Sequence, residues 1–143
     1  MNEKFMKEAI KLSEKALKND EMPVGAVVVC ENKIIGRGYN KKEKYNDATM
    51  HAEIIAIKKA SKYIKDWRLN KCSIYVTMEP CTMCIGAIIE SRIPIIFCGI
   101  KNKKTNLVNK NLIKDNNLII KYGIFEEEIT KITEKFFKTI RNR

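Results

Sequence analysis

Apolar residues at both ends of the chain recur every three or four positions, which predicts two amphipathic helices. In the first, which ends near residues 19–20, the repeating positions are Phe5, Ala9, Leu12 and Ala16. The last begins at the acidic run of residues 126–128, and its repeating positions are Ile129, Ile132, Phe136 and Ile140. Acids at its start and Lys and Arg near its end suit the helix dipole.

Between these helices the pattern changes to short apolar runs that are typical of strands. Runs at residues 24–30 and 34–39 flank Glu31-Asn32, which suits a tight reversal, so a hairpin is predicted. Gly25, Gly36 and Gly38 lie inside these strands, where glycine suggests a bulge, the close approach of some other group, or simply core packing.

The rest of the chain alternates helices with strands. Further strands are predicted at residues 72–78, 94–99 and 118–121, and further helices at residues 51–64, 81–91 and 107–114. The polar stretch at residues 40–50 predicts a loop. This order predicts an α/β fold, a mixed sheet with helices packed on it. The length fits one hydrophobic core, so a single domain spanning residues 1–143 is expected.

Two short motifs place metal-binding side chains at the starts of two predicted helices. His51 is the only histidine, and Cys81 and Cys84 follow Pro80. Cysteines three residues apart at a helix start lie on the same side of the first turn. One imidazole and two thiolates form a suitable ligand set for Zn²⁺ and leave its fourth tetrahedral position for another ligand. The sequence therefore predicts one zinc site built from His51, Cys81 and Cys84.

Glu53 adds a carboxylate to this site. Two residues apart on a regular helix, His51 and Glu53 would point to nearly opposite sides, so both reach one site only if His51 lies at the helix entrance. Zinc lowers the pKa of a bound water from ~16 to about 7. A carboxylate beside the metal is suited to moving the protons of a hydrolytic deamination. The expected catalytic residue is Glu53.

Other interpretations of the cysteines are open at this point. A Cys-x-x-Cys pair alone also suits redox chemistry or a zinc knuckle. A closed, purely structural zinc site would take its fourth ligand from Cys30, Cys72 or Cys98. A non-catalytic RNA-binding module with such a site is the corresponding functional alternative, but it has no use for Glu53.

Charge favours a polyanionic partner. The chain carries 28 Lys and Arg against 17 Asp and Glu, a net charge of +11. Such an excess favours nucleic acid, although a lysine-rich solvated surface gives the same count. The apolar runs are too short to span a bilayer, and charges interrupt residues 1–12, so neither membrane insertion nor secretion is expected. The predicted location is cytoplasmic, with the remaining cysteines as reduced core residues.

The pattern His-x-Glu followed by Pro-Cys-x-x-Cys is similar to the signature of the zinc-dependent cytidine deaminase superfamily. Within it, the chain most resembles the bacterial tRNA-specific adenosine deaminase family. The resemblance rests on residues 22–28, 38–40, 47–53, 74–84 and 86–93, and on Phe136-Phe137 in the last helix.

This resemblance implies a three-layer α/β/α fold with helices on both faces of a mixed sheet. It implies conversion of adenosine to inosine at the wobble position, anticodon position 34, of a tRNA anticodon stem-loop, by a homodimer. It further implies that His51, Cys81 and Cys84 bind Zn²⁺, that Glu53 moves protons, and that Asn40 and Ala52 contact the substrate. Asn40 also suits a second role, as a turn residue that closes the second strand.

One segment departs from the family pattern. Residues 100–106 lack the usual glycine and have Asn102 where an aspartate is expected. The zinc ligands do not separate a tRNA enzyme from a free-base or nucleoside deaminase acting on guanine, cytosine or cytidine. The positive charge favours RNA over a small neutral substrate.

Overall fold

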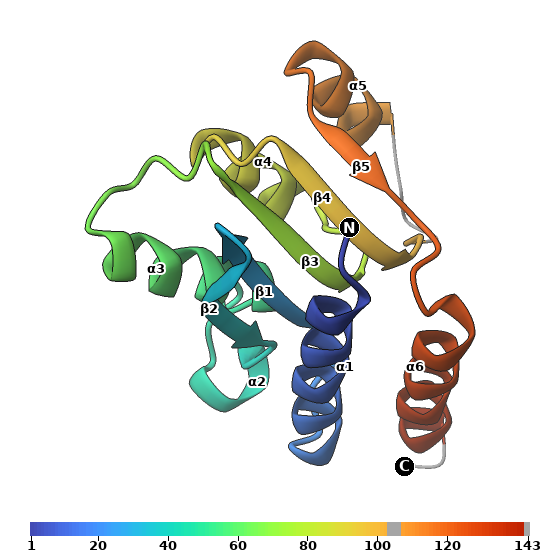
Figure 1. Ribbon diagram of the computed structural model, residues 1–143. Helices are drawn as coiled ribbons and strands as arrows, with labels where there is room; N and C mark the ends of the chain where they lie inside the picture. Colours follow the sequence, from blue (N-terminus) through green and yellow to red (C-terminus); the bar gives the residue numbers. More distant parts are fainter. Residues whose placement is uncertain (103–106, 142–143) are drawn as a thin grey trace.

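A five-stranded mixed sheet lies at the centre of the computed structural model, which describes residues 1–102 and 107–141 (Figure 1). The strand order is β2-β1-β3-β4-β5. β1 pairs antiparallel with both β2 and β3, whereas β3, β4 and β5 run parallel. The strands are β1 (Gly25–Cys30), β2 (Lys33–Tyr39), β3 (Cys72–Met78), β4 (Ile95–Ile100) and β5 (Ile119–Lys121). The predicted mixed sheet is confirmed.

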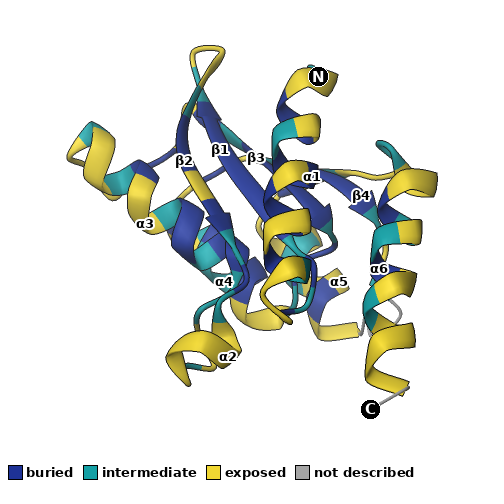
Figure 2. Cartoon of the chain, turned by 90° about the horizontal axis from the view of Figure 1, so that it is seen from below, coloured by how far each residue is buried: buried dark blue, intermediate teal, exposed yellow. Residues whose placement is uncertain are grey.

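Helices cover both faces of this sheet (Figures 1 and 2). One face packs against α1 (Glu3–Lys18) and α6 (Glu126–Arg141). The other packs against α3 (Ala52–Ile64), α4 (Thr82–Glu90) and α5 (Leu107–Asp115). A hydrophobic core lies on each face of the sheet, and successive strand residues point into the two cores in turn. In β1, for example, Val27 faces α1 and Val28 faces α3 and α4. The three-layer α/β/α arrangement is therefore confirmed.

The hairpin brings α3 unusually close to the sheet. Glu31 and Asn32 have positive φ angles of 51° and 62°, as a two-residue hairpin turn requires. A Cβ atom on Gly36 would collide with the Ala56 carbonyl oxygen of α3, and one on Gly38 with the Ala52 carbonyl oxygen. A register shift at Val28/Val29 shows that β1 and β2 also contain a bulge. The glycines thus allow the backbone of α3, including its first turn, to pack directly on β2.

We expect Gly36→Ala to lower the free energy of unfolding by about 1–3 kcal/mol, because the methyl group must displace the backbone of α3. Gly86→Ala in α4 is the matched control, because a Cβ there has open space and alanine favours helix. Urea denaturation curves measure both. Equal stabilities of the two variants would contradict the close approach of α3.

One predicted element differs from the structure. The expected loop at residues 40–50 contains a short helix, α2 (Lys42–Tyr45). None of its residues is buried, so it has no apolar periodicity for a sequence pattern to detect. The other elements lie within one or two residues of their predicted bounds. Across the described part of the chain, no helix is long and apolar enough to cross a membrane.

Candidate metal centre

His51, Cys81 and Cys84 meet at the carboxyl end of β3, between the starts of two helices. His51 is the N-cap of α3, with extended backbone angles (φ −81°, ψ 154°). Cys81 is the N-cap of α4, and Cys84 lies in the first turn of that helix. His51 therefore stands at the helix entrance, which is the condition for its side chain and that of Glu53 to reach one site.

The distances within this cluster fit a tetrahedral zinc ion. His51 Nδ1 lies 3.6 Å from Cys81 Sγ and 3.6 Å from Cys84 Sγ. Zn–N and Zn–S bonds at a tetrahedral angle separate the two ligand atoms by about 3.5–3.6 Å. Within the described ranges, this is the only group of three or more potential ligands whose atoms lie within 4.8 Å of one another. The donor set and its spacing both suit Zn²⁺ and supply three of the four ligands of a tetrahedral site.

A closed, four-ligand site is not supported. Cys30, Cys72 and Cys98 all lie outside the cluster, although Cys72 and Cys98 are buried as predicted. All five cysteines are free thiols. Burial raises the pKa of Cys72 to about 12 and that of Cys98 well above its usual value. These thiols behave as core residues rather than as metal ligands.

Glu53 is a buried carboxyl group next to the cluster, with only 3% of its surface exposed. Its carboxyl group lies close enough to Cys84 for the two groups to shift each other's pKa. Burial raises the pKa of Glu53 to about 7. The chain thus places a carboxyl group beside the predicted metal but outside the group of ligand atoms, where a proton shuttle is required.

The two cluster thiols differ in pKa because the interaction between them shifts each one in the opposite direction. A hydrogen bond from Cys84 lowers the pKa of Cys81 to about 4, and a second from His51 adds to the effect. The same hydrogen bond, together with burial, raises the pKa of Cys84. The lowered pKa of Cys81 favours its thiolate, which is the form that binds a metal.

The two predicted substrate residues lie in different settings. Asn40 is largely buried: its Nδ2 donates to the Met22 carbonyl oxygen (3.5 Å), and its Oδ1 accepts from the Lys42 backbone N–H (3.1 Å). These are the contacts of a turn residue. Ala52 is fully buried, with its carbonyl oxygen against Gly38. A substrate contact from either residue stays a prediction.

Several residues that support the metal centre were not found from the sequence. Glu79 is 3% exposed; its Oε1 accepts from the Asn102 backbone N–H (2.9 Å) and its Oε2 from the Tyr122 hydroxyl (2.7 Å). The Thr82 hydroxyl donates to Asn109 Oδ1 (2.6 Å). These bonds connect the strand end before Cys81 and the start of α4 to segments far along the chain. The only feature of the sequence that pointed to any of these residues was the acid, Glu79, directly before Pro80.

The unusual segment after β4 is described only in part. Asn102 stands where the family has an acid. Its backbone N–H, rather than its side chain, donates the hydrogen bond to Glu79. Residues 103–106 lie outside the described residues. The replacement is therefore compatible with this contact, since any residue except proline supplies a backbone N–H.

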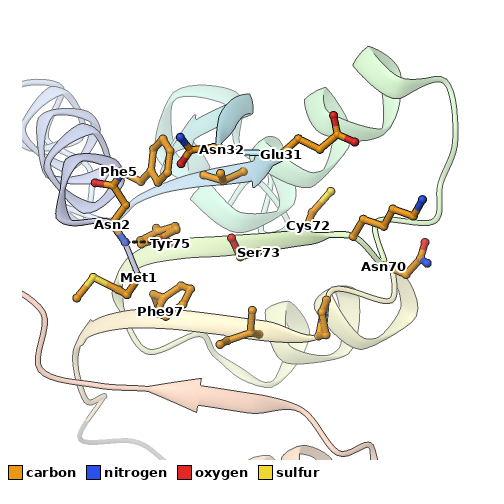
Figure 3. Close-up of a pocket in the computed structure, with 14 residues that line it drawn as sticks. Met1, Asn2, Phe5, Glu31, Asn32, Asn70, Cys72, Ser73, Tyr75 and Phe97 are labelled. Carbon is orange, nitrogen blue, oxygen red and sulfur yellow. Dashed lines mark hydrogen bonds between the residues drawn. The ribbon is translucent and has the colours of Figure 1, made fainter.

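A groove of about 530 Å³ lies on the face of the sheet that packs against α1 (Figure 3). Its floor includes Tyr75 and Phe97, whose rings stack with centroids 4.6 Å apart. The Asn2 backbone N–H donates to the Tyr75 hydroxyl at its edge (3.0 Å). None of the predicted site residues lines this groove.

The fold and the cluster with its buried carboxyl group define a zinc-binding deaminase. The sequence profile of the family described as "Cytidine and deoxycytidylate deaminase zinc-binding region" matches residues 1–100, which include all three cluster residues and Glu53. A tRNA-specific adenosine deaminase of Buchnera aphidicola is 44% identical over 142 residues, covering 96% of this chain and 94% of that protein. The chain belongs to the family of tRNA-specific adenosine deaminases within these zinc-binding deaminases.

Two solved structures bear on the choice of substrate. One comes from a study of A-to-I editing by tRNA:A34 deaminases at the wobble position; it is 33% identical, with a TM-score of 0.85, covering 92% of this chain and 99% of that one. The other is guanine deaminase from Bacillus subtilis, 38% identical with a TM-score of 0.66, covering 71% of this chain and 66% of that one. The first similarity spans nearly the whole chain, whereas the second spans only part of it.

Proposed function

We propose that this protein is a zinc-dependent hydrolase that converts adenosine to inosine at the wobble position of a tRNA anticodon. The observation that carries the proposal is the buried Glu53 beside the His51–Cys81–Cys84 cluster, in a chain with close tRNA-specific relatives. We assign His51, Cys81 and Cys84 as the ligands of one Zn²⁺ per chain and Glu53 as the catalytic residue. Asn40 and Ala52 are proposed to contact the extruded nucleoside.

The chain's own residues account for the proton movements of such a reaction. When bound, zinc supplies Lewis-acid activation of the water that attacks C6 of adenine. Glu53 accepts a proton from this water, delivers one to the ring nitrogen and assists departure of the amine as ammonia. Its burial keeps competing water away from the carboxyl group, and the backbone of α3 fixes it relative to His51.

Clusters of positive charge support an RNA substrate. Lys41, Lys42 and Lys44 lie in and before α2, directly after Asn40. Lys135, Lys138 and Arg141 lie near the end of α6. Neutralising phosphates with such side chains supplies most of the non-specific affinity for a nucleic acid. A deaminase pocket must also receive an unstacked base, and single-stranded loops present such bases.

The test is to incubate the zinc-loaded protein with an anticodon stem-loop that carries adenosine at position 34, and to measure inosine by mass spectrometry. Free adenosine, cytidine, cytosine and guanine serve as parallel substrates. Inosine formed only in the stem-loop is the expected result. Turnover of a free base or nucleoside alone would instead identify the alternative, and the partial similarity to guanine deaminase makes guanine the essential comparison.

We further propose a single catalytic domain that acts in the cytoplasm as a homodimer. The free thiols support a reducing compartment. The short apolar runs at residues 88–89 and 95–97 have the composition of a dimer surface, but they lie mostly in the core. The dimer proposal therefore rests on the family resemblance. Sedimentation at micromolar concentration tests it, and a 16.6 kDa species alone would contradict it.

A further inference from the structure

α2 has no apolar anchor to the rest of the protein. None of its four residues is buried, and it projects as an exposed segment below the sheet (Figure 2). Its N-cap residue, Lys41, makes no side-chain capping hydrogen bond. A helix of this length is not stable alone, because the free-energy cost of nucleating a helix exceeds the stabilisation that one turn of hydrogen bonds provides. Hydrogen bonds from elsewhere in the chain must therefore hold it.

Two upstream side chains supply these bonds. The Asn40 Oδ1 accepts from the Lys42 N–H (3.1 Å). The Glu21 carboxylate accepts from the next two backbone N–H groups: Oε1 from Glu43 (2.9 Å) and Oε2 from Lys44 (2.8 Å). The Tyr45 N–H donates to the Lys41 carbonyl oxygen (3.1 Å). All four N–H groups at the start of α2 are thus accounted for, two of them by Glu21.

Glu21 is well suited to hold another segment in place. It lies between α1 and β1 and is 1% exposed, so its carboxylate is fixed in the body of the protein. Buried carboxylates are costly unless hydrogen bonds compensate them, and bonds from N–H groups to a charged acceptor are stronger than neutral ones. Because both oxygens bond to α2, loss of this carboxylate removes the main connection between α2 and the core.

α2 borders the metal centre through the segment that leads into His51. The Lys41 N–H donates to the Met50 carbonyl oxygen (3.0 Å), which closes residues 41–50 into a loop directly before His51. The loop therefore begins next to the predicted substrate residue Asn40 and ends next to a metal ligand. It carries Lys41, Lys42 and Lys44, so its position sets where these charges meet a polyanion.

We propose that Glu21 is a positioning residue for RNA binding: its buried carboxylate holds α2 and the α2 lysines beside the active site. This inference rests on the proposed function. Glu21 does not touch the reacting atoms and acts through α2. It sets the fraction of molecules whose α2 is placed to bind RNA, and apparent affinity falls in proportion to that fraction.

The Glu21→Gln variant tests this proposal, because the two effects of the change shift KM for the stem-loop in opposite directions. Release of α2 raises KM, whereas loss of a negative charge lowers it. An amide offers one acceptor oxygen where two are needed, so α2 is released and KM for the stem-loop rises by about tenfold or more. We expect kcat to change less than about threefold, since zinc and Glu53 are untouched. Removal of a negative charge near a basic surface would by itself lower KM.

The matched control is Glu14→Gln, which removes the same charge from an exposed position on α1. It should leave KM unchanged or slightly lower. A KM for Glu21→Gln that equals or falls below that of the control would overturn the proposal. If Glu21→Gln does not fold, as judged by its melting curve and zinc content, Glu21→Asp takes its place. This variant keeps the charge but shortens the reach, so it should also raise KM, and a wild-type KM would overturn the proposal.

Hydrogen exchange separates this inference from the proposed function. In wild-type protein the backbone amides of Glu43 and Lys44 should be protected, and in Glu21→Gln they should exchange at least about tenfold faster. Unchanged protection would overturn the anchoring role whatever the substrate. If the wild-type protein does not deaminate the stem-loop but the exchange result holds, the proposed function fails while the anchoring of α2 stands.

Discussion

Replacement of Glu53 by glutamine is expected to lower kcat for inosine formation by about 10²–10⁴-fold while the protein keeps one zinc ion per chain. Glutamine has nearly the same volume, so the buried site around residue 53 keeps its packing. The amide, however, does not accept and return a proton as a carboxylate does. Because Glu53 lies outside the group of ligand atoms, metal binding should survive the change. Single-turnover inosine formation and the zinc-to-protein ratio are the two measurements.

Glu90→Gln serves as the control for Glu53→Gln. Glu90 is an exposed acid at the end of α4, so its loss changes the net charge equally and leaves the site intact. Its kcat should match that of the wild type. If Glu53→Gln retained wild-type kcat, the proton-shuttle role would be wrong. If it lost zinc together with activity, Glu53 would belong to the metal ligands instead.

The sequence was sufficient for features that depend on local pattern. The period of the apolar residues located the helices and strands because each of these elements buries one face. The condition that His51 occupy a helix entrance followed from helix geometry alone, and the structure meets it. Helix geometry also predicts that Cys81 and Cys84 share one side of the start of α4, and in the structure both sulfur atoms lie 3.6 Å from the same imidazole nitrogen.

Features that depend on long-range polar contacts were not predictable in this way. α2 is held by hydrogen bonds from its backbone to Glu21, which precedes Glu43 by 22 residues. No local sequence pattern indicates that contact. The bond between Glu79 and Tyr122 spans 43 residues. Hydrophobic periodicity reports which face of an element is buried. Hydrophobic periodicity does not indicate which buried carboxylate accepts a hydrogen bond from which distant donor, because such pairs do not recur at a regular spacing along the chain.

Replacement of Cys84 by serine should remove zinc from the protein. A serine hydroxyl stays protonated at neutral pH and is a poor replacement for a thiolate, so we expect zinc affinity to fall by more than about a hundredfold. Inosine formation should fall below detection, because loss of the metal removes the activation of the attacking water. Zinc content after gel filtration and competition with a chelator measure the first effect, and the stem-loop assay measures the second.

Cys98→Ser is the control that isolates metal binding from burial. Cys84 and Cys98 are both fully buried, so serine places a hydroxyl in a 0% exposed position in either case. The Cys98 thiol donates to the Ile100 carbonyl oxygen (3.2 Å), a bond that serine is able to keep. Cys98 lies outside the metal cluster. Cys98→Ser should therefore retain zinc and activity. Stoichiometric zinc in Cys84→Ser would refute the ligand assignment, whereas equal zinc loss in both variants would trace the effect to the packing of the core.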